Sequence, residues 1–445
     1  MIGLGTTVGA GVFVITGTAA AHYAGPAIAA SFLVACLVCL CPGACYAEFS
    51  SMFPEAAGAY SFSVLSMGRF IGWMTGWCVI LEYLMAASSL AVGWSGYVDG
   101  FFESLGFAPD PAWTRAVVGW QPGGGLHPTG ALFNVPAAAI VLMLAGVLSL
   151  GTRESSRVGV LVATIKILTV LAIIAVGAVH IDPSNWRPFI PPNAGHWGIF
   201  GLSGILRGAG VAFVAYLGFD VAAAVARDVV EPQRTVPRAM IAIIAICTAL
   251  YVSMSLVVTG LVSYMQLDVP NPVTVALNGL PSSASWFRLI IGVATILGLT
   301  AGIFGVLFAQ VRVFAEMSRD RLLPTSMSRI SRRRESPVIA TAVAGGLVAI
   351  LAGLFPVNLL AELIAIGTLT VFVVVCAGIP LMRVRAPHLS RPFRVPASPL
   401  LPAVGAVSCV LMMASLPWET WLRFAAWLAV GAVVYAGGKV FSASI

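Results

Sequence analysis

Two charged side chains, Lys166 and Glu82, stand inside long apolar stretches of the sequence. Lys166 lies about eight residues from the nearer end of the stretch 158–179, which is a depth of ~12 Å along a helix. A lysine at that depth can take up and release a proton, so Lys166 is a candidate proton-exchange site that would face the first apolar segment. The alternative is a lysine whose ammonium reaches back to the interface, although its stem spans only about half that depth.

Glu82 is the only acidic residue between Arg69 and Asp99. A carboxylate inside a membrane is a candidate functional site, and Lys166 is its candidate partner in proton coupling. The alternative is a structural pair that holds helices together. Arg207 lies ~12 Å from the end of another apolar stretch. We interpret Arg207 as a paired structural charge, while an outer gate or an anion contact stays open.

Glycine interrupts the first apolar segment and the sixth. The first segment has glycines at positions 3, 5, 9 and 11, and each costs a helix about 1 kcal/mol relative to alanine. The sixth places Gly218 and Asp220 inside an otherwise apolar stretch. Interruptions at segments one and six predict two five-helix inverted repeats, whose breaks at Gly9, Gly11 and Gly218 meet near the membrane midplane. Alternatively, the glycines only allow helices to pack closely.

An unwound helix inside a membrane offers its backbone groups to a ligand. Freed N–H groups at the N-terminus of a half-helix attract a carboxylate. Freed carbonyls at the opposing break attract an ammonium. An α-amino acid carries this pair of charges, so the two breaks predict a binding site for amino acids.

Cysteines and short motifs give no sign of a metal site or of catalysis. Four of the eight cysteines lie at positions 36, 39, 41 and 45. At 100° per residue these four point to different sides of a helix, so we interpret them as packing residues and not as metal ligands. The sequence contains no P-loop, no H-E-x-x-H and no G-x-S-x-G. We therefore predict a protein that is not an enzyme and that uses no cofactor and no metal.

The composition indicates that membrane helices position these residues. The chain has 445 residues, of which 59% are hydrophobic and only 9% are charged, whereas soluble proteins carry about 25% charged residues. So much apolar surface requires lipid as the solvent, where the backbone must be satisfied inside helices or a closed barrel. The apolar runs are continuous and do not alternate, which favours an all-α multi-pass membrane protein over a barrel.

We predict twelve transmembrane helices, each near the ~20 residues that cross the hydrocarbon layer. They lie at 1–20, 26–49, 71–98, 132–150, 158–179, 199–221, 239–261, 286–317, 338–354, 358–381, 400–416 and 424–441. If both termini are cytoplasmic, 18 of the 24 basic residues fall in inner loops and four in outer loops. This positive-inside bias predicts an integral protein, most simply of the plasma membrane, that binds no nucleic acid. The outer loop 99–131 is rich in glycine and proline, which predicts irregular structure.

With these features the sequence resembles the amino acid–polyamine–organocation superfamily, in particular the cationic amino acid transporters and their bacterial relatives. The resemblance covers nearly the whole chain. It is carried, in order, by the stretches Met1–Gly17, Gly76–Tyr83, Ala215–Asp220 followed by Glu231–Arg234, and Met317–Pro324. The family implies a LeuT-like five-plus-five inverted repeat with two additional helices. The implied units are a ten-helix transport core at 1–381, with repeats at about 1–179 and 199–381, and two peripheral helices at 400–441.

The resemblance also implies where a substrate lies. It places the substrate carboxylate at the backbone of Val8, Gly9, Ala10 and Gly11. It places the amino group near the carbonyls of Val214, Ala215 and Leu217, with Phe219 closing the site. In proton-coupled members a segment-five lysine lies beside the first break, and Lys166 matches that position. Glu82 matches the glutamate of segment three.

The chain departs from the family pattern in three places. Members usually have a cytoplasmic tail and a further turn or two of helix before the position of Met1, so this chain is expected to begin inside the first half-helix. An acid pair that follows segment six reads Arg227-Asp228 here, which weakens the case for cationic substrates. Segment eight reads Ala301 to Gly305 where relatives commonly carry Ser or Thr, although Thr300 lies close by.

The sequence therefore predicts a secondary active transporter of L-amino acids, with cationic amino acids favoured, that is coupled to protons and works by alternating access. Its predicted partners are a small amino acid, protons and the lipid bilayer, and the sequence indicates no particular partner protein. Alternatives are a carrier or exchanger of neutral amino acids or polyamines, and an amino acid sensor. A channel would show rings of like charges or carbonyls, whereas this sequence has isolated charges.

Overall fold

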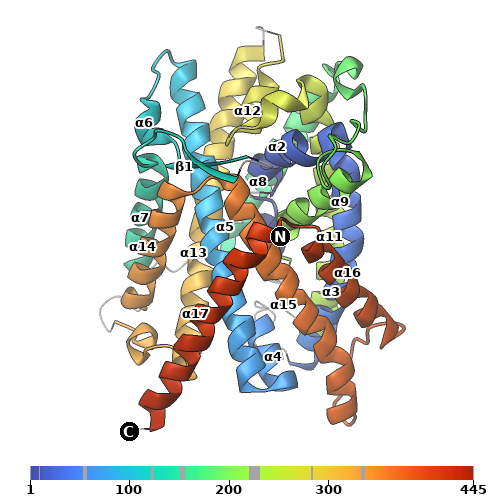
Figure 1. Cartoon of the computed structure of the whole chain (residues 1–445), viewed down its shortest axis with the longest axis vertical. Helices are drawn as coiled ribbons and strands as arrows, with labels where there is room; N and C mark the ends of the chain where they lie inside the picture. The colour runs from blue at the N-terminus through green and yellow to red at the C-terminus, as the bar shows by residue number, and fades with distance from the viewer. Residues whose placement is uncertain are drawn as a thin grey trace.

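A computed structural model describes residues 2–9, 11–53, 58–121, 125–150, 156–219, 231–281, 284–331 and 336–443. Long helices run side by side along its longest axis (Figure 1). The first segment is a chain of short pieces: α1 Ile2–Thr7, the π-helix η1 Gly11–Ile15, α2 Thr16–Ala19, the π-helix η2 Ala20–Ala24 and the 3₁₀ turn η3 Gly25–Ala27. It continues without a loop into α3 Ile28–Met52.

The remaining long helices follow the predicted apolar segments. They are α5 Arg69–Ser104, α7 Val135–Ser149, α8 Ser156–Ala178, α9 Gly201–Ala212, α11 Pro232–Leu261, α13 Ser285–Arg319, α14 Val338–Leu354, α15 Val357–Arg385, α16 Leu400–Ala414 and α17 Trp418–Ala443. Short helices join them: α4 Ala59–Met67, α6 Pro111–Thr114, η4 Pro183–Trp186, η5 Phe213–Tyr216, η7 Tyr264–Leu267, α12 Pro272–Leu277 and η9 Thr325–Ser328.

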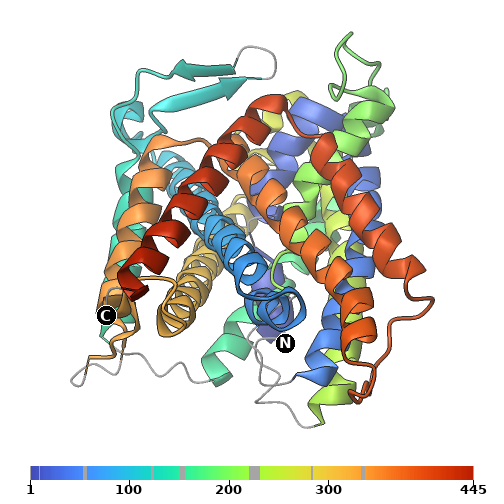
Figure 2. The ribbon, with the colours of Figure 1, turned by 60° about the horizontal axis from the view of Figure 1, so that its bottom comes forward.

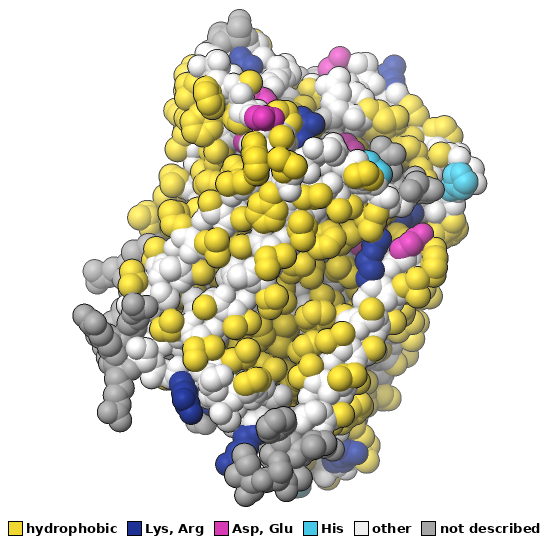
Figure 3. Space-filling view, turned by 60° about the vertical axis from the view of Figure 1, so that its left-hand side comes forward, with side chains coloured by type: hydrophobic (Ala, Val, Ile, Leu, Met, Phe, Trp, Pro, Cys, Tyr) yellow, Lys and Arg dark blue, Asp and Glu magenta, His cyan; other side chains and the backbone are white. Residues whose placement is uncertain are grey.

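Apolar side chains cover the outside of the bundle as well as its interior. Within the described residues, seven helical stretches are long and apolar enough to cross a membrane, and the first of them, Gly11–Met52, runs through two predicted segments. Four further apolar helices are 10–17 residues long. Figure 3 shows hydrophobic side chains across the middle of one face, with charged side chains mainly in its upper part and at its lower end. Such a surface is stable in lipid, so the chain is a multi-pass membrane protein.

The loop at 99–131, predicted to be irregular, is partly regular, so that prediction was wrong. After α5 and α6, β1 Val118–Gln121 pairs antiparallel with β2 Gly125–Pro128. Trp120 is buried, and its ring lies edge-on to His22 at 5.9 Å between centroids. The strands are therefore held by a contact distant in sequence, which the local glycine and proline content does not reveal. The hairpin stands at one end of the bundle and α4 at the other (Figures 1 and 2).

Helices from distant parts of the chain surround the first segment. α1 packs against α8, α11 and α13, while α3 packs against α9 and α11. α5 and α13 lie antiparallel, because a Cβ on Gly76 would lie 2.8 Å from Met317 and one on Gly302 would lie 3.4 Å from Leu90. This arrangement places the interrupted parts of segments one and six in the interior of the bundle.

Candidate functional site

The first segment is interrupted at Val8 and Gly9. α1 ends at Thr7, residues 8 and 9 form a bend, and helical structure resumes at Gly11. The Val8 N–H still donates to the carbonyl of Leu4 at 3.0 Å. Ala10 lies outside the described residues. Because a helix start leaves N–H groups without partners inside the helix, this break exposes donors in the middle of an apolar core.

The sixth segment is interrupted where its helix tightens and then turns. α9 ends at Ala212, and η5 continues as a 3₁₀ turn to Tyr216. Leu217 is extended at ψ 138° and donates to the carbonyl of Val214 at 3.2 Å. Gly218 has φ +102°, a backbone conformation that only glycine adopts without strain. Asp220 lies outside the described residues.

The two interruptions contact each other directly. A Cβ added to Gly11 would lie 2.1 Å from the Cα of Ala215, so only glycine allows η1 to approach η5 this closely. Tyr251, on α11, reaches both breaks, because its hydroxyl oxygen lies within hydrogen-bond distance of the carbonyls of Thr7, at 2.9 Å, and Ala215, at 2.8 Å. The predicted substrate residues of both segments thus converge on one place.

Aromatic rings line the sixth-segment side of this place. Phe219 is buried and lies 5.4 Å from the ring of Phe372 on α15 and 5.9 Å from that of Tyr46 on α3. Phe213 also lies 5.4 Å from Phe372. These rings give the convergence point an apolar wall and exclude water from it.

Lys166 extends from α8 toward the first break. Only 4% of the residue is exposed, and its Nζ donates to the carbonyl of Gly5 at 3.1 Å. A Cβ on Gly302 of α13 would lie 3.6 Å from this Nζ. The ammonium therefore points into the bundle, toward α1, and not toward an interface. The Thr300 hydroxyl has other partners than the Lys166 ammonium: it donates to the Ile296 carbonyl and accepts from the Trp94 indole N–H.

Glu82 lies on α5 at a different level. It is buried, and Gly93 follows it by eleven residues, which is three helical turns, so the two share one face. A Cβ on Gly93 would lie 2.4 Å from Val14 in η1, so this face looks toward the first segment. The α5 residue at the level of Lys166 is Leu90, about 12 Å along the axis from Glu82.

Comparison with known proteins identifies the family. A model of the amino acid permeases matches residues 1–436. The methylthioribose transporter of Bacillus subtilis (strain 168) is 38% identical, and the alignment covers 98% of this chain and 90% of that protein. The branched-chain amino acid permease BcaP of the same organism is 37% identical with the same coverage. The vacuolar cationic amino acid transporter 4 of Arabidopsis thaliana is 34% identical over 86% of this chain and 62% of its own length.

The chain belongs to the amino acid permease family. The resemblance to the amino acid–polyamine–organocation superfamily is thereby confirmed. The relatives named above are transporters, which points to transport and not to catalysis. The substrates in the names of these relatives differ, so family membership leaves the substrate side chain open.

One end of this permease carries a buried ion network around Glu362 of α15. Glu362 accepts from the hydroxyls of Thr420 at 2.7 Å and Tyr23 at 3.2 Å, and lies 3.9 Å from Arg207 and 3.8 Å from Arg423. The guanidinium of Arg207 stacks over the Tyr23 ring at 4.7 Å. Arg207 is thus a paired charge, as the sequence suggested. The sequence analysis did not single out Glu362, although an acidic residue inside the predicted segment 358–381 was a signal that could have found it.

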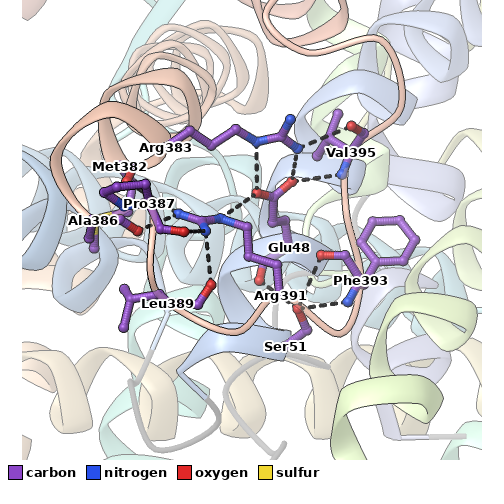
Figure 4. A network of polar contacts seen from close by, with 10 residues as sticks. All are labelled: Glu48, Ser51, Met382, Arg383, Ala386, Pro387, Leu389, Arg391, Phe393 and Val395. Atoms are coloured by element: carbon purple, nitrogen blue, oxygen red, sulfur yellow. Dashed lines mark hydrogen bonds and ion pairs between the residues drawn. The ribbon is translucent and has the colours of Figure 1, made fainter.

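The other end of the permease carries a second network, around Glu48 of α3 (Figure 4). The fully buried Glu48 carboxylate accepts from Arg383 at 2.6 and 3.1 Å, accepts from the Val395 N–H at 2.7 Å, and lies 3.6 Å from Arg391. Arg391 also donates to backbone carbonyls between 382 and 389. The network fastens the segment after α15 to the end of α3. Sequence reasoning missed Glu48 as well.

The two networks lie on either side of the breaks along α15. Arg383 follows Glu362 by 21 residues on α15, a rise of about 32 Å along the helix. Phe372, whose ring lies near those of Phe219 and Phe213, is about halfway between the two residues on the helix. The sixth-segment break of the permease therefore lies between the two ion networks.

The cysteines of the permease are free thiols that pack between helices. A Cβ on Gly405 of α16 would lie 2.7 Å from the Cβ of Cys41 and 3.1 Å from the Sγ of Cys376. In the described part of the chain, no group of three or more His, Cys, Asp or Glu is placed to hold a metal ion. Arg227 and Asp228 lie outside the described residues.

Proposed function

We propose that this permease is a secondary active transporter of L-amino acids that is coupled to protons and works by alternating access. The observation that carries the proposal is the direct contact between the two helix breaks, Gly11 against Ala215, in the interior of the bundle. Unwound backbone inside a membrane protein is tolerated where it lines a site, and it offers donors for a carboxylate and acceptors for an ammonium. We take residues 1–381 as the LeuT-like transport core and 400–441 as two additional helices.

In this proposal the backbone binds the invariant part of the substrate. The carboxylate lies at the N–H groups of the first break, and the ammonium lies at the carbonyls of the sixth segment. The residues assigned to the first group are Val8, Gly9, Ala10 and Gly11, and those assigned to the second are Val214, Ala215 and Leu217. Phe219 covers the site from the sixth-segment side.

The environment of the breaks bears on the substrate side chain. The rings of Phe213, Phe219 and Phe372 beside the breaks favour an apolar side chain, and BcaP is 37% identical over 98% of this chain. The sequence alone favoured cationic amino acids. Glu82, on the α5 face toward segment one, still supports them, because its carboxylate would attract a cationic side chain. We place branched-chain amino acids first and cationic ones second.

Transport by purified protein in proteoliposomes tests the substrate assignment. Labelled leucine, isoleucine, arginine, lysine and methylthioribose are supplied with and without a pH gradient. We expect accumulation of an amino acid that rises with a gradient acidic on the side of supply. Uptake of methylthioribose alone would refute the amino acid assignment, because an uncharged sugar thioether needs no ammonium site.

Lys166 is the proposed coupling group. Its ammonium donates to the Gly5 carbonyl just before the first break, so loss of its proton changes the contact between α8 and α1. Lys166→Ala should abolish proton-driven accumulation while substrate exchange continues, since the backbone site is retained. Leu168→Ala, two residues along and 58% exposed, is the matched control and should behave as wild type. Unchanged pH-dependent uptake by Lys166→Ala would remove Lys166 from the mechanism.

A further inference from the structure

The buried ion network around Glu362 holds more positive charge than negative. It contains the carboxylate of Glu362 and the guanidiniums of Arg207 and Arg423. Glu362 is 1% exposed and Arg207 is 8% exposed, so this excess lies away from water. Asp268, at the same end of the bundle, pairs with His22 at 2.8 Å. Because a buried charge without a counter-charge is costly, a further negative charge would stabilise the network.

The two guanidiniums of this network keep N–H groups that no protein acceptor uses. Nε of Arg207 and Nη1 of Arg423 are buried, and neither has a hydrogen-bond partner among the described residues. Their approaches to Glu362, at 3.9 and 3.8 Å, are too long for hydrogen bonds. The Glu362 oxygens accept instead from the hydroxyls of Tyr23 and Thr420. Each arginine can therefore donate to another acceptor.

The network around Glu48 shows what the same composition looks like when the protein supplies the acceptors. Arg383 donates two hydrogen bonds to Glu48 and one to the Val395 carbonyl. Arg391 donates to the backbone carbonyls of residues 382, 386, 387 and 389. The arginines around Glu48 are thus engaged by the protein, whereas those around Glu362 are not.

We propose that Arg207 and Arg423 form a binding site for a small monovalent anion beside Glu362. The ligand is chloride or the carboxylate group of a small molecule, because guanidinium N–H groups bind small anions by charge-assisted hydrogen bonds. The bound anion neutralises the excess charge and accepts from the buried N–H groups. The Tyr23 ring, 4.7 Å from the Arg207 guanidinium, holds this donor in place from the other side.

Equilibrium binding of labelled chloride and labelled acetate to the purified protein in nanodiscs tests the site, with sulfate as the balancing anion. The two probes separate an inorganic anion from a carboxylate. Arg423→Gln should weaken binding at least about tenfold, because a charged donor is lost. Arg288→Gln, on α13 at the hairpin end and outside the network, is the matched control and should bind as wild type does. No saturable binding of either probe, or equal binding by Arg423→Gln, would overturn the proposal.

Glu362→Gln gives the opposite sign and so separates an anion site from a purely structural network. Removing this carboxylate takes away the negative charge that competes with the anion for both guanidiniums, so affinity should rise at least about tenfold. A misfolded protein could not produce such a gain. Glu48→Gln removes the same charge from the other network and should leave affinity unchanged.

Unchanged or weaker anion binding in Glu362→Gln would contradict the proposal, and so would an equal gain in both glutamate variants, since that would reflect overall charge alone. Neither probe has to cross the membrane in this measurement. The result therefore stands whether or not the permease carries amino acids, and a failure of the proposed transport function would be seen separately in the proteoliposome experiment.

Discussion

The space around the Lys166 ammonium is made by residues without side chains. A Cβ on Gly298 would lie 3.2 Å from Cγ of Lys166, and one on Gly302 would lie 3.6 Å from its Nζ. Both glycines belong to α13, so this helix lets the lysine stem cross its surface toward α1. Sequence reasoning had noticed this stretch only because it lacks a hydroxyl.

Gly302→Val should therefore impair the lysine specifically. The added methyl groups would crowd the Nζ and Leu90, whose side chain is already 3.4 Å from a Cβ at this position. Gly305→Val is the matched control, because a Cβ there meets no atom within 4 Å. We expect proton-driven uptake to fall at least about tenfold in Gly302→Val, the loss that about 1.4 kcal/mol produces, and to persist in Gly305→Val. Equal uptake by the two variants would show that a valine side chain at position 302 does not disturb the Lys166 ammonium.

Single residues were predicted from the sequence where their own type was unusual for its surroundings. Lys166 and Glu82 stand out as charges in apolar segments, and the contact of Lys166 with Gly5 agrees with the expected direction. Tyr251 gave no such signal, because a tyrosine in an apolar helix is common and its two acceptors are backbone carbonyls up to 244 residues away. Every residue supplies a backbone carbonyl, so a hydrogen bond to such a carbonyl cannot be predicted from the type of the accepting residue.

At the scale of elements, apolar run length predicted most helices to within a few residues. The stretch 338–354 was predicted with the bounds that α14 has, and α8 at Ser156–Ala178 differs by two residues at its start. Long helices such as α5, which ends at Ser104 where the predicted stretch ends at 98, extend past the apolar run, because polar residues continue a helix beyond the lipid. The hairpin of Trp120 was missed because tertiary contacts hold it. The twelve-helix count and the inverted repeat remain predictions.

The contact between η1 and η5 depends on a single missing methyl group. Gly11→Ala would place a Cβ 2.1 Å from the Ala215 backbone, so the two broken segments must separate. Substrate affinity should fall at least about tenfold, while membrane insertion continues. Gly346→Ala on α14, where a Cβ meets no atom within 4 Å, is the control. Binding measured by the thermal shift of each purified variant with substrate separates the two, and wild-type affinity in Gly11→Ala would mean that the glycine only packs helices.

At the scale of the whole molecule, α15 connects two ion networks of the same composition. Each has one buried glutamate and two arginines: Glu362 with Arg207 and Arg423, and Glu48 with Arg383 and Arg391. The first joins α15 to η2, α9 and α17 at the end that carries the hairpin. The second joins α15 to α3 at the end that carries α4. The breaks lie between them, so under the proposed alternating access an opening at either end would separate the network at that end.

Neutralising each glutamate should therefore favour opening at its own end. The proposed alternating access sets the two ends against each other, and a coupling of about 1–3 kcal/mol would change the ratio of open states at least about fivefold. Glu362→Gln should expose the breaks on the hairpin side, and Glu48→Gln should expose them on the α4 side. Both substitutions keep the side-chain shape and remove the charge that two arginines share.

A cysteine at Val214 reports this opening, because Val214 is only 4% exposed in this structure. In a protein whose native cysteines are replaced, an impermeant maleimide is applied to vesicles of either orientation. Glu362→Gln should speed labelling from the hairpin side and Glu48→Gln from the opposite side. Glu419→Gln, beside Thr420 on α17 and outside the network, should label as the parent does. Faster labelling from the same side in both glutamate variants would mean that the networks stabilise the fold and do not alternate as gates.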